Sequence, residues 1–181
     1  IDDGAGVGIT MAAAALIKPL KPARTIRVVA FANEEQGLFG GRAYAEKYFK
    51  DVEKHHIAAE SDFGAGRIYG FDSSAPDFAK PAIEQIAQAL APLGIERLPG
   101  KGDPESDIGA LTARGMAWGW LGHDGTDYFD LHHNADDTLD KIDPKVLAQN
   151  VAAYAVFAYL SAQSDGGFGS APKEAEPRRQ R

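Results

Sequence analysis

The sequence predicts an α/β fold in which a mostly parallel or mixed sheet lies between helices. Short β-branched and apolar runs alternate with longer segments of helical spacing along the 181 residues. The apolar fraction of 44% and the charged fraction of 25% are ordinary for a globular domain with a core. Acidic clusters follow the predicted strands, where site residues of open α/β sheets gather.

The first predicted element is an Ala-rich helix over Gly4–Leu20 with apolar residues on most faces, so we expect it to be largely buried. An aspartate precedes it as a cap, and Pro19 and Pro22 end it. The apolar run Thr25–Ala32 has the pattern of a strand covered on both faces. Helical spacing returns over Gly37–Phe49.

The second half of the predicted domain repeats this alternation. Ile57–Ala59 is a short apolar run that indicates another buried strand. Asp77–Leu93 is predicted to be an amphipathic helix, and Met116–Leu121 a further strand. Asp143–Ala162 is a long apolar segment that predicts the closing helix.

Composition excludes several classes of protein. The formal charge of −7 argues against a surface for nucleic acid or anionic membrane. No apolar run approaches the length of a transmembrane helix. The chain has no cysteine, which excludes disulfides and thiolate metal sites. Residues 165–181 are rich in Gly, Pro and charge and are predicted to be a disordered tail.

Three acidic clusters stand where carboxyl ends of strands are predicted. Asp2 and Asp3 precede the first helix, Glu34 and Glu35 follow one strand, and Asp62 follows the next. If the strands are neighbours, these carboxylates converge, and several acids share a dry cleft only with a cation. Convergence therefore implies a metal ion.

Each acidic motif also has an ordinary interpretation. The pair Glu34 and Glu35 suits the dipole of a helix N-terminus. Asp-Asp-Gly at Asp2–Gly4 is a common turn signal. In favour of chemistry, adjacent residues of an extended segment point to different sides. One glutamate can therefore bind a metal while its neighbour acts on a water.

The histidines differ in their surroundings. The segment "DLHHNADDTLD", Asp130–Asp140, places histidine beside several acids, as in a zinc or mixed-metal site, although a solvated acidic loop has the same composition. His55 and His56 are interpreted as a polar lead into a strand, and His123 as a loop histidine.

Taken in order, these motifs resemble the M28-type zinc peptidases, and within that family the carboxypeptidase Q branch. The resemblance covers residues 1 to about 164. It implies a zinc-exopeptidase fold, of which residues 1–164 are the C-terminal major part of the catalytic domain. The motifs that carry it are "DDGAGV" (Asp2–Val7), "RVVAFANEEQGLFGGRAY" (Arg27–Tyr44), "AAESDFG" (Ala58–Gly64) and "DGTDYFDLHHNADDTLDKIDP" (Asp124–Pro144).

The resemblance implies a role for five residues and a cofactor of two zinc ions. Asp2 matches the carboxylate that bridges both ions, and Glu34 matches the general base. Glu35 matches a ligand of one zinc ion, and Asp62 a ligand of the second. His133 matches the imidazole ligand, because the following Asp-Thr-Leu stands at the family's distance from it.

The implied activity is hydrolysis of N-terminal peptide bonds in dipeptides or short peptides by an aminopeptidase or dipeptidase. The partner is then a peptide substrate, a homodimer is compatible, and export is favoured by the relatives alone. The segment Leu98–Gly115 is expected to form part of the specificity wall.

One family motif is missing. The family's upstream His-x-Asp does not occur before Ile1. We therefore expect an N-terminally truncated sheet, weak metal binding and an inactive chain when it is studied alone.

Two further functions fit the same scaffold. One is a peptidase-like domain that binds without catalysis, whose signature would be lost ligands. The other is a one-zinc acyltransferase of the glutaminyl cyclase kind, which the number of metal ions would distinguish. A calcium-binding module fits less well, because histidine is a poor calcium ligand.

Overall fold

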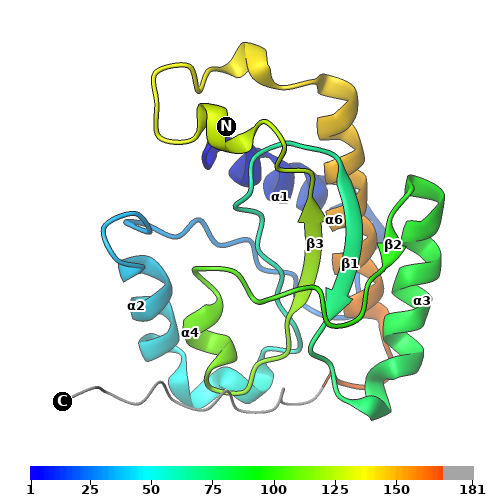
Figure 1. Cartoon of the computed structure of the whole chain (residues 1–181). Helices are drawn as coiled ribbons and strands as arrows, with labels where there is room; N and C mark the ends of the chain where they lie inside the picture. Colours follow the sequence, from blue (N-terminus) through cyan, green and yellow to red (C-terminus); the bar gives the residue numbers. More distant parts are fainter. Residues whose placement is uncertain (169–181) are drawn as a thin grey trace.

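The computed structural model describes residues 1–168 of the chain, with six α-helices and one three-stranded sheet in that part (Figure 1). The helices are α1 (Gly4–Ile17), α2 (Phe39–Lys47), α3 (Lys80–Leu90), α4 (Gly109–Thr112), α5 (Tyr128–Leu131) and α6 (Pro144–Gln163). The strands are β1 (Ile68–Ser73), β2 (Glu96–Arg97) and β3 (Gly119–His123). The 3₁₀ helices are η1 (Lys18–Leu20), η2 (Phe49–Lys54), η3 (Asp77–Ala79), η4 (Ala91–Leu93) and η5 (Leu139–Lys141).

The sheet is mixed, which confirms the predicted α/β class. Its order is β2-β1-β3, with β1 parallel to β2 and antiparallel to β3. The β1–β3 register shifts between Ile68 and Gly70. There the side-chain amide of Gln149, on α6, substitutes for a strand by accepting from Ile68 N and donating to Ile68 O. The central strand is thereby tied to the longest helix.

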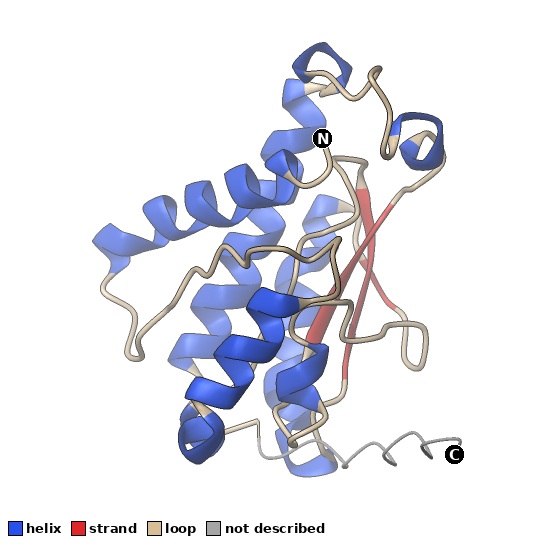
Figure 2. Cartoon of the chain, turned by 90° about the vertical axis from the view of Figure 1, so that its left-hand side faces the viewer, coloured by secondary structure: helices blue, strands red, loops and turns tan. Residues whose placement is uncertain are grey.

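The core lies between the sheet and helices α1, α3 and α6. Figure 2 shows these helices on one side of the strands. Phe71 and Leu121 from the sheet, Ile9 from α1 and Ile86 from α3 are fully buried there. Burial of such side chains contributes about 1.5–3 kcal/mol each. The core therefore holds the N-terminus of α1 in place beside the end of β3.

The helix predictions are confirmed with small shifts at the ends. α6 begins one residue later than predicted, at Pro144, because Asp143 is its cap and its carboxylate accepts from Lys145 N at 2.7 Å. Helix α3 is extended by 3₁₀ turns to cover the predicted Asp77–Leu93. The expectation that the first helix is largely buried is wrong, because Met11 and Leu16 are more than half exposed. Only one face of α1 packs on α6.

Two strand predictions are wrong in whole or in part. Thr25–Ala32 forms no strand, because no backbone ladder reaches it within the described residues, and its side chains line a cavity instead. β-branched residues make a strand only where a neighbour supplies the ladder. Ile57–Ala59 is reduced to one bridge, in which Ala58 pairs with Trp118 in parallel.

The sheet contains strands that the sequence did not indicate. β1 reads "IYGFDS", and its glycine and aspartate are poor strand formers. Asp72 is nevertheless buried, because its carboxylate accepts from Lys101 N and Gly102 N at 3.0 Å and pairs with Arg97. The strand predicted over Met116–Leu121 begins later, as β3, because its ladder partner is β1.

The chain end departs from the predicted tail in one place. Phe168 is fully buried in the core, so the disordered tail predicted over residues 165–181 does not begin at residue 165. The remainder, 169–181, falls outside the described residues. No helix in the part of the chain that the structure covers has the length and apolar character to cross a membrane.

Candidate metal centre

The candidate centre forms where four segments meet: the start of α1, the turn after residue 33, the segment after residue 59 and the loop that follows α5. Asp3 caps α1 by accepting from Gly6 N at 2.9 Å, which places Asp2 directly in front of the helix. Gly37 N and Leu38 N donate to Glu34 O and close the turn that carries both glutamates. These local hydrogen bonds fix the positions of Asp2 and of the two glutamates in their own segments.

Backbone strain accompanies this construction. Asn33 and His133 have φ angles of 58° and 59°, and Glu105, in the loop before α4, has 61°. Residues other than glycine rarely adopt this left-handed region of backbone conformation. Residues that do so concentrate at functional sites. Each of these residues precedes or belongs to a segment that brings an acid or imidazole to the centre.

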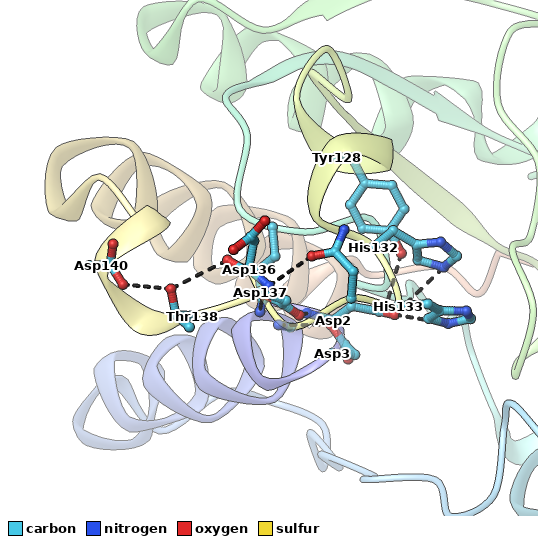
Figure 3. A network of polar contacts seen from close by, with 12 residues as sticks. Asp2, Asp3, Tyr128, His132, His133, Asp136, Asp137, Thr138 and Asp140 are labelled. Atoms are coloured by element: carbon cyan, nitrogen blue, oxygen red, sulfur yellow. Dashed lines mark hydrogen bonds and ion pairs between the residues drawn. The ribbon is translucent and has the colours of Figure 1, made fainter.

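Asp2 is held in a fixed orientation (Figure 3). Its backbone N–H donates to Asp137 Oδ2 at 2.9 Å, and the hydroxyl of Tyr128 donates to its Oδ1 at 3.1 Å. The amino group of Ile1 forms an ion pair with Asp137. The remaining oxygen of Asp2, Oδ2, faces the two histidines that follow α5.

His133 joins two of the acidic clusters. Its Nε2 lies 2.5 Å from Glu35 Oε1 and 3.3 Å from Asp2 Oδ2. His132 Nε2 lies 3.6 Å from the same Asp2 oxygen, and its ring stacks on that of His133. Asp2, His132 and His133 present donor atoms that all lie within 4.8 Å of one another.

Asp62 belongs to the same electrostatic environment. Burial raises the pKa of its carboxyl to about 8, and the negative charges of Asp3 and Glu60 add to the effect, as do those of Glu34 and Asp2. Burial likewise raises the pKa of Asp3 to about 7. Asp62 shares no hydrogen bond or ion pair with the other predicted ligands in the described part of the chain. It therefore joins the cluster through charge rather than contact.

Glu34 shares the environment of two other acids. The pKa of the Asp107 carboxyl lies above its usual range because of burial and then because of the charge of Glu34. Glu34, Glu35 and Asp62 all line one cavity of 1330 Å³, which extends along α1. Glu34 thus belongs electrostatically with Asp62 and Asp107, whereas Glu35 contacts His133.

Two further acids near the centre, Glu60 and Glu105, were not predicted from the sequence. The Glu60 carboxylate accepts from Asp107 N at 3.0 Å and Ile108 N at 2.8 Å, so it fastens the predicted specificity segment to the centre. Burial raises the pKa of Glu60 to about 7 and that of Glu105 to about 8. The only sequence signal for Glu60 is its place two residues before Asp62.

The remaining histidines lie away from these contacts. His55 contacts the Tyr44 hydroxyl at 3.0 Å, and His56 accepts from Arg24 Nε at 3.0 Å. The interpretation of His123 as a loop residue is wrong, because it ends β3 and is buried. Burial lowers its pKa to about 4.

The donor set fits a divalent transition metal. Carboxylates whose pKa values rise because they are buried, and further because they lie near one another, gain most from a cation placed among them. An imidazole beside two carboxylates is a donor set that zinc uses. The centre therefore has the residue types and the excess negative charge that a zinc site requires.

Comparison with known proteins finds peptidases. The sequence profile of Peptidase family M28 matches residues 1–158. Carboxypeptidase Q of Mus musculus is 32% identical over 167 residues, and that of Homo sapiens is 31% identical over 167 residues. Each alignment covers 91% of this chain and 35% of the relative, so the chain spans about a third of their length.

A solved structure shares the fold. The crystal structure of a peptidase M28 precursor from Shewanella amazonensis SB2B superposes with a TM-score of 0.91 and 49% sequence identity. The match covers 96% of this chain and 40% of that one.

Proposed function

Because the chain belongs to Peptidase family M28, we propose that its acidic centre is a zinc site that hydrolyses peptide bonds. In this proposal, two zinc ions are held by Asp2, Glu35, Asp62 and His133, and Glu34 is the general base. The relatives named carboxypeptidase Q support peptide hydrolysis as the reaction class.

One observation carries the proposal most directly. His133 Nε2 approaches both Glu35 Oε1 and Asp2 Oδ2, and these three residues come from separate segments. A solvated acidic loop or an ordinary helix start would not bring them together. The electrostatic coupling of Asp62 to Asp2, Asp3 and Glu34 extends the same centre to a fourth segment.

The chemistry follows from the residues around the reacting bond. Zinc bound at this centre would polarise the scissile carbonyl and lower the pKa of the attacking water. The Glu34 carboxylate accepts a proton from that water and passes it to the leaving amine. Glu35 Oε1 already contacts His133 Nε2, so in this proposal Glu35 is the ligand and its neighbour Glu34 the base.

The substrate is a dipeptide or short peptide with a free amino terminus. Asp3, Glu60 and Glu105 add carboxyls beyond those needed for two zinc ions, and burial among like charges raises their pKa values. Such an environment favours a ligand that brings a positive charge, as an α-ammonium group does.

A peptidase assay with controlled metal content tests the proposal. The protein that carries this chain together with the upstream His-x-Asp is freed of metal with a chelator, reloaded with zinc and incubated with a set of unblocked dipeptides and their N-acetylated counterparts. We expect it to hydrolyse unblocked peptides in a zinc-dependent way, whereas residues 1–181 alone should show little activity. A protein with this motif that binds zinc but hydrolyses neither set would contradict the proposal and favour a non-catalytic binding domain.

A further inference from the structure

Three departures from the sequence-based expectations lie on the walls of one cavity. Thr25–Ala32 forms no strand, Ile57–Ala59 is reduced to one bridge, and α1 exposes apolar side chains. Residues of all three segments line the cavity of 1330 Å³ that reaches the acidic centre. A single cause at this place would account for all three.

The backbone of the first of these segments is unpaired. In the part of the chain that the structure describes, no backbone N–H or C=O group of residues 25–31 takes part in a hydrogen bond. The apolar β-branched residues Ile26, Val28 and Val29 favour the conformation of a strand. A row of unpaired backbone groups in such a segment is a template for pairing with another strand.

The second segment has an open edge. Ala58 uses both of its backbone groups on the β3 side, because its N–H donates to Ala117 O at 3.1 Å and its C=O accepts from Gly119 N at 2.8 Å. Backbone groups of adjacent residues in a strand point to opposite edges, so those of Ile57 and Ala59 point away from β3. Neither residue has a backbone hydrogen bond in the described part of the chain. The sheet therefore ends here with an unpaired edge.

Helix α1 contributes an apolar wall that is open to solvent. Val7 is 40% exposed and Met11 is 60% exposed, and both line the cavity. Phe157 and Ala158 of α6 line it as well. Contiguous apolar surface of this kind marks a place where another polypeptide or a ligand packs.

The size of the cavity favours a polypeptide segment over a small molecule. Small-molecule sites occupy about 300–1,000 Å³, and this cavity of 1330 Å³ is larger. Within the described residues, Thr25–Ala32 and Ile57–Ala59 share no hydrogen bond, although residues of both line it. Paired strands lie about 4.8 Å apart, so a strand set between the two segments would pair with both.

The relatives indicate where such a strand comes from. The chain spans 35% of the length of carboxypeptidase Q and 40% of that of the solved M28 peptidase, so both proteins have further polypeptide. A second copy of this chain fits less well. The free β-prone segment it offers is Thr25–Ala32, whose residues line the cavity, and its insertion would remove that wall from the copy that supplies it.

We propose that the cavity receives an apolar β-strand from the remaining polypeptide of a longer M28 protein. This strand pairs with Thr25–Ala32 on one side and with Ile57–Ala59 on the other. It covers Val7 and Met11 of α1, and it joins Thr25–Ala32 to the three-stranded sheet. The inference concerns the assembly of the fold and does not rest on the proposed function.

Hydrogen exchange tests the pairing. Residues 1–181 are compared with the longer protein that carries them together with the upstream polypeptide, and exchange of the backbone amides of residues 25–31 is followed by mass spectrometry. We expect these amides to exchange at least about 100-fold more slowly in the longer protein, because hydrogen-bonded amides exchange only when the structure opens. The amides of β1, which pairs with β3 within residues 1–181, are the reference.

Thiol labelling tests which face is covered. The chain has no cysteine, so Met11→Cys and Leu16→Cys each introduce one thiol into α1. Met11 lines the cavity and is 60% exposed, whereas Leu16 is 57% exposed but is not part of the described cavity wall. We expect a charged maleimide to label Met11→Cys at least about tenfold more slowly in the longer protein than in residues 1–181, because the covered thiol reacts only after local opening. Leu16→Cys, the matched control, should react equally fast in both.

The other outcomes overturn the proposal. Equal exchange of residues 25–31, or equal labelling of Met11→Cys, in both proteins would show that no strand enters the cavity. Slow labelling of both thiols in the longer protein would show that the cover is not specific to the cavity. Protection of residues 25–31 that appears in residues 1–181 alone and increases with concentration would assign the cavity to a second copy. Zinc does not enter these measurements, so the peptidase proposal is tested separately.

Discussion

The imidazole of His133 and the carboxylate of Glu35 are in contact, with Nε2 and Oε1 2.5 Å apart, although 98 positions separate the residues in the sequence. This contact distinguishes Glu35 from its neighbour Glu34. Glu35 contacts His133, whereas the charge of Glu34 raises the pKa of the Asp107 and Asp62 carboxyls. We therefore expect a ligand role for Glu35 and a proton-transfer role for Glu34.

Replacement of Glu35, the proposed ligand, should lower zinc affinity and thereby activity. We expect Glu35→Ala to lower zinc affinity by more than about 100-fold, because a direct ligand is worth more than the outer partners that contribute 10–100-fold. Peptidase activity should return in part at high zinc concentration. The measurement is a chelator-competition titration. Glu46→Ala, an exposed glutamate of α2, is the control. Unchanged zinc affinity in Glu35→Ala would contradict the ligand role.

Tyr128 is expected to position Asp2. Tyr128→Phe removes the 3.1 Å hydrogen bond to Asp2 Oδ1 but keeps the ring that stacks on Phe63 at 4.4 Å. We predict a loss of zinc affinity of about tenfold, within the range for outer partners of metal ligands. The melting temperature of the metal-free chain should change little. Equal zinc affinity in parent and variant would show that the hydroxyl does not orient Asp2.

The sequence indicated in part which acids and which histidine meet. Asp2, Glu35 and His133 are brought together, whereas Asp62 shares no hydrogen bond or ion pair with them in the described part of the chain and is linked to Asp2 by charge alone. Whether these residues bind metal stays a prediction. Tyr128 and Glu60 were missed for a physical reason. Tyr128 opens the short helix α5 and Glu60 lies in a loop, so neither carries a periodic signal, and their partners lie 126 and 47 positions away.

The pH dependence of stability tests whether the pKa values of the buried, neighbouring carboxyls are raised. Asp62 and Glu60 have folded-state pKa values of about 8 and about 7, above their ordinary values of 3.8 and 4.5. The folded chain therefore binds more protons than the unfolded chain, and stability falls as pH rises through these values. The pKa of His123 is lowered from 6.5 to about 4, so this residue makes stability rise with pH, but only below about pH 6.5.

The metal-free chain should therefore lose stability between pH 6.5 and 8.5. Thermal unfolding in the presence of a chelator is the measurement, and the melting temperature should decrease steadily over this interval. Glu60→Gln should reduce the slope, because it removes one of the titrating carboxyls. Saturating zinc should also reduce it, since a cation favours the ionised carboxylates. A melting temperature that stays constant or rises over this pH interval would contradict the raised pKa values of these carboxyls.

The fold was predictable where local pattern and tertiary structure agree. α3 and α6 follow from the helical spacing of their apolar residues, and both are found. β1 was not indicated, because its Gly70 and Asp72 are tolerated only through long-range contacts such as the pairing of Asp72 with Arg97. The opposite error occurs at Thr25–Ala32, which was predicted to be a strand. Its β propensity is strong, but no neighbouring strand in the described part of the chain supplies the hydrogen bonds of a ladder.

The sheet itself offers a stability test. Leu121 on β3 is fully buried, and its backbone pairs with Phe71 on β1. Leu121→Ala should lower the free energy of unfolding by about 2–5 kcal/mol, from lost burial and the cavity left behind. Denaturant unfolding measures it. Leu139→Ala, at a residue that is 83% exposed, should have little effect. A loss below about 1 kcal/mol at Leu121 would contradict its place in the core.

Glu34→Gln isolates proton transfer from metal binding. The amide has nearly the shape of the carboxylate but cannot accept the proton of the attacking water, so we expect kcat to fall by about 10²–10⁴-fold. Zinc affinity should remain close to that of the parent, because Glu34 does not contact His133, whereas Glu35 does. Steady-state hydrolysis of an unblocked dipeptide and the chelator titration are measured on the same preparation. A Glu34→Gln variant that turns over at the parent rate would remove Glu34 as the base, and one that loses zinc as Glu35→Ala does would make it a ligand instead.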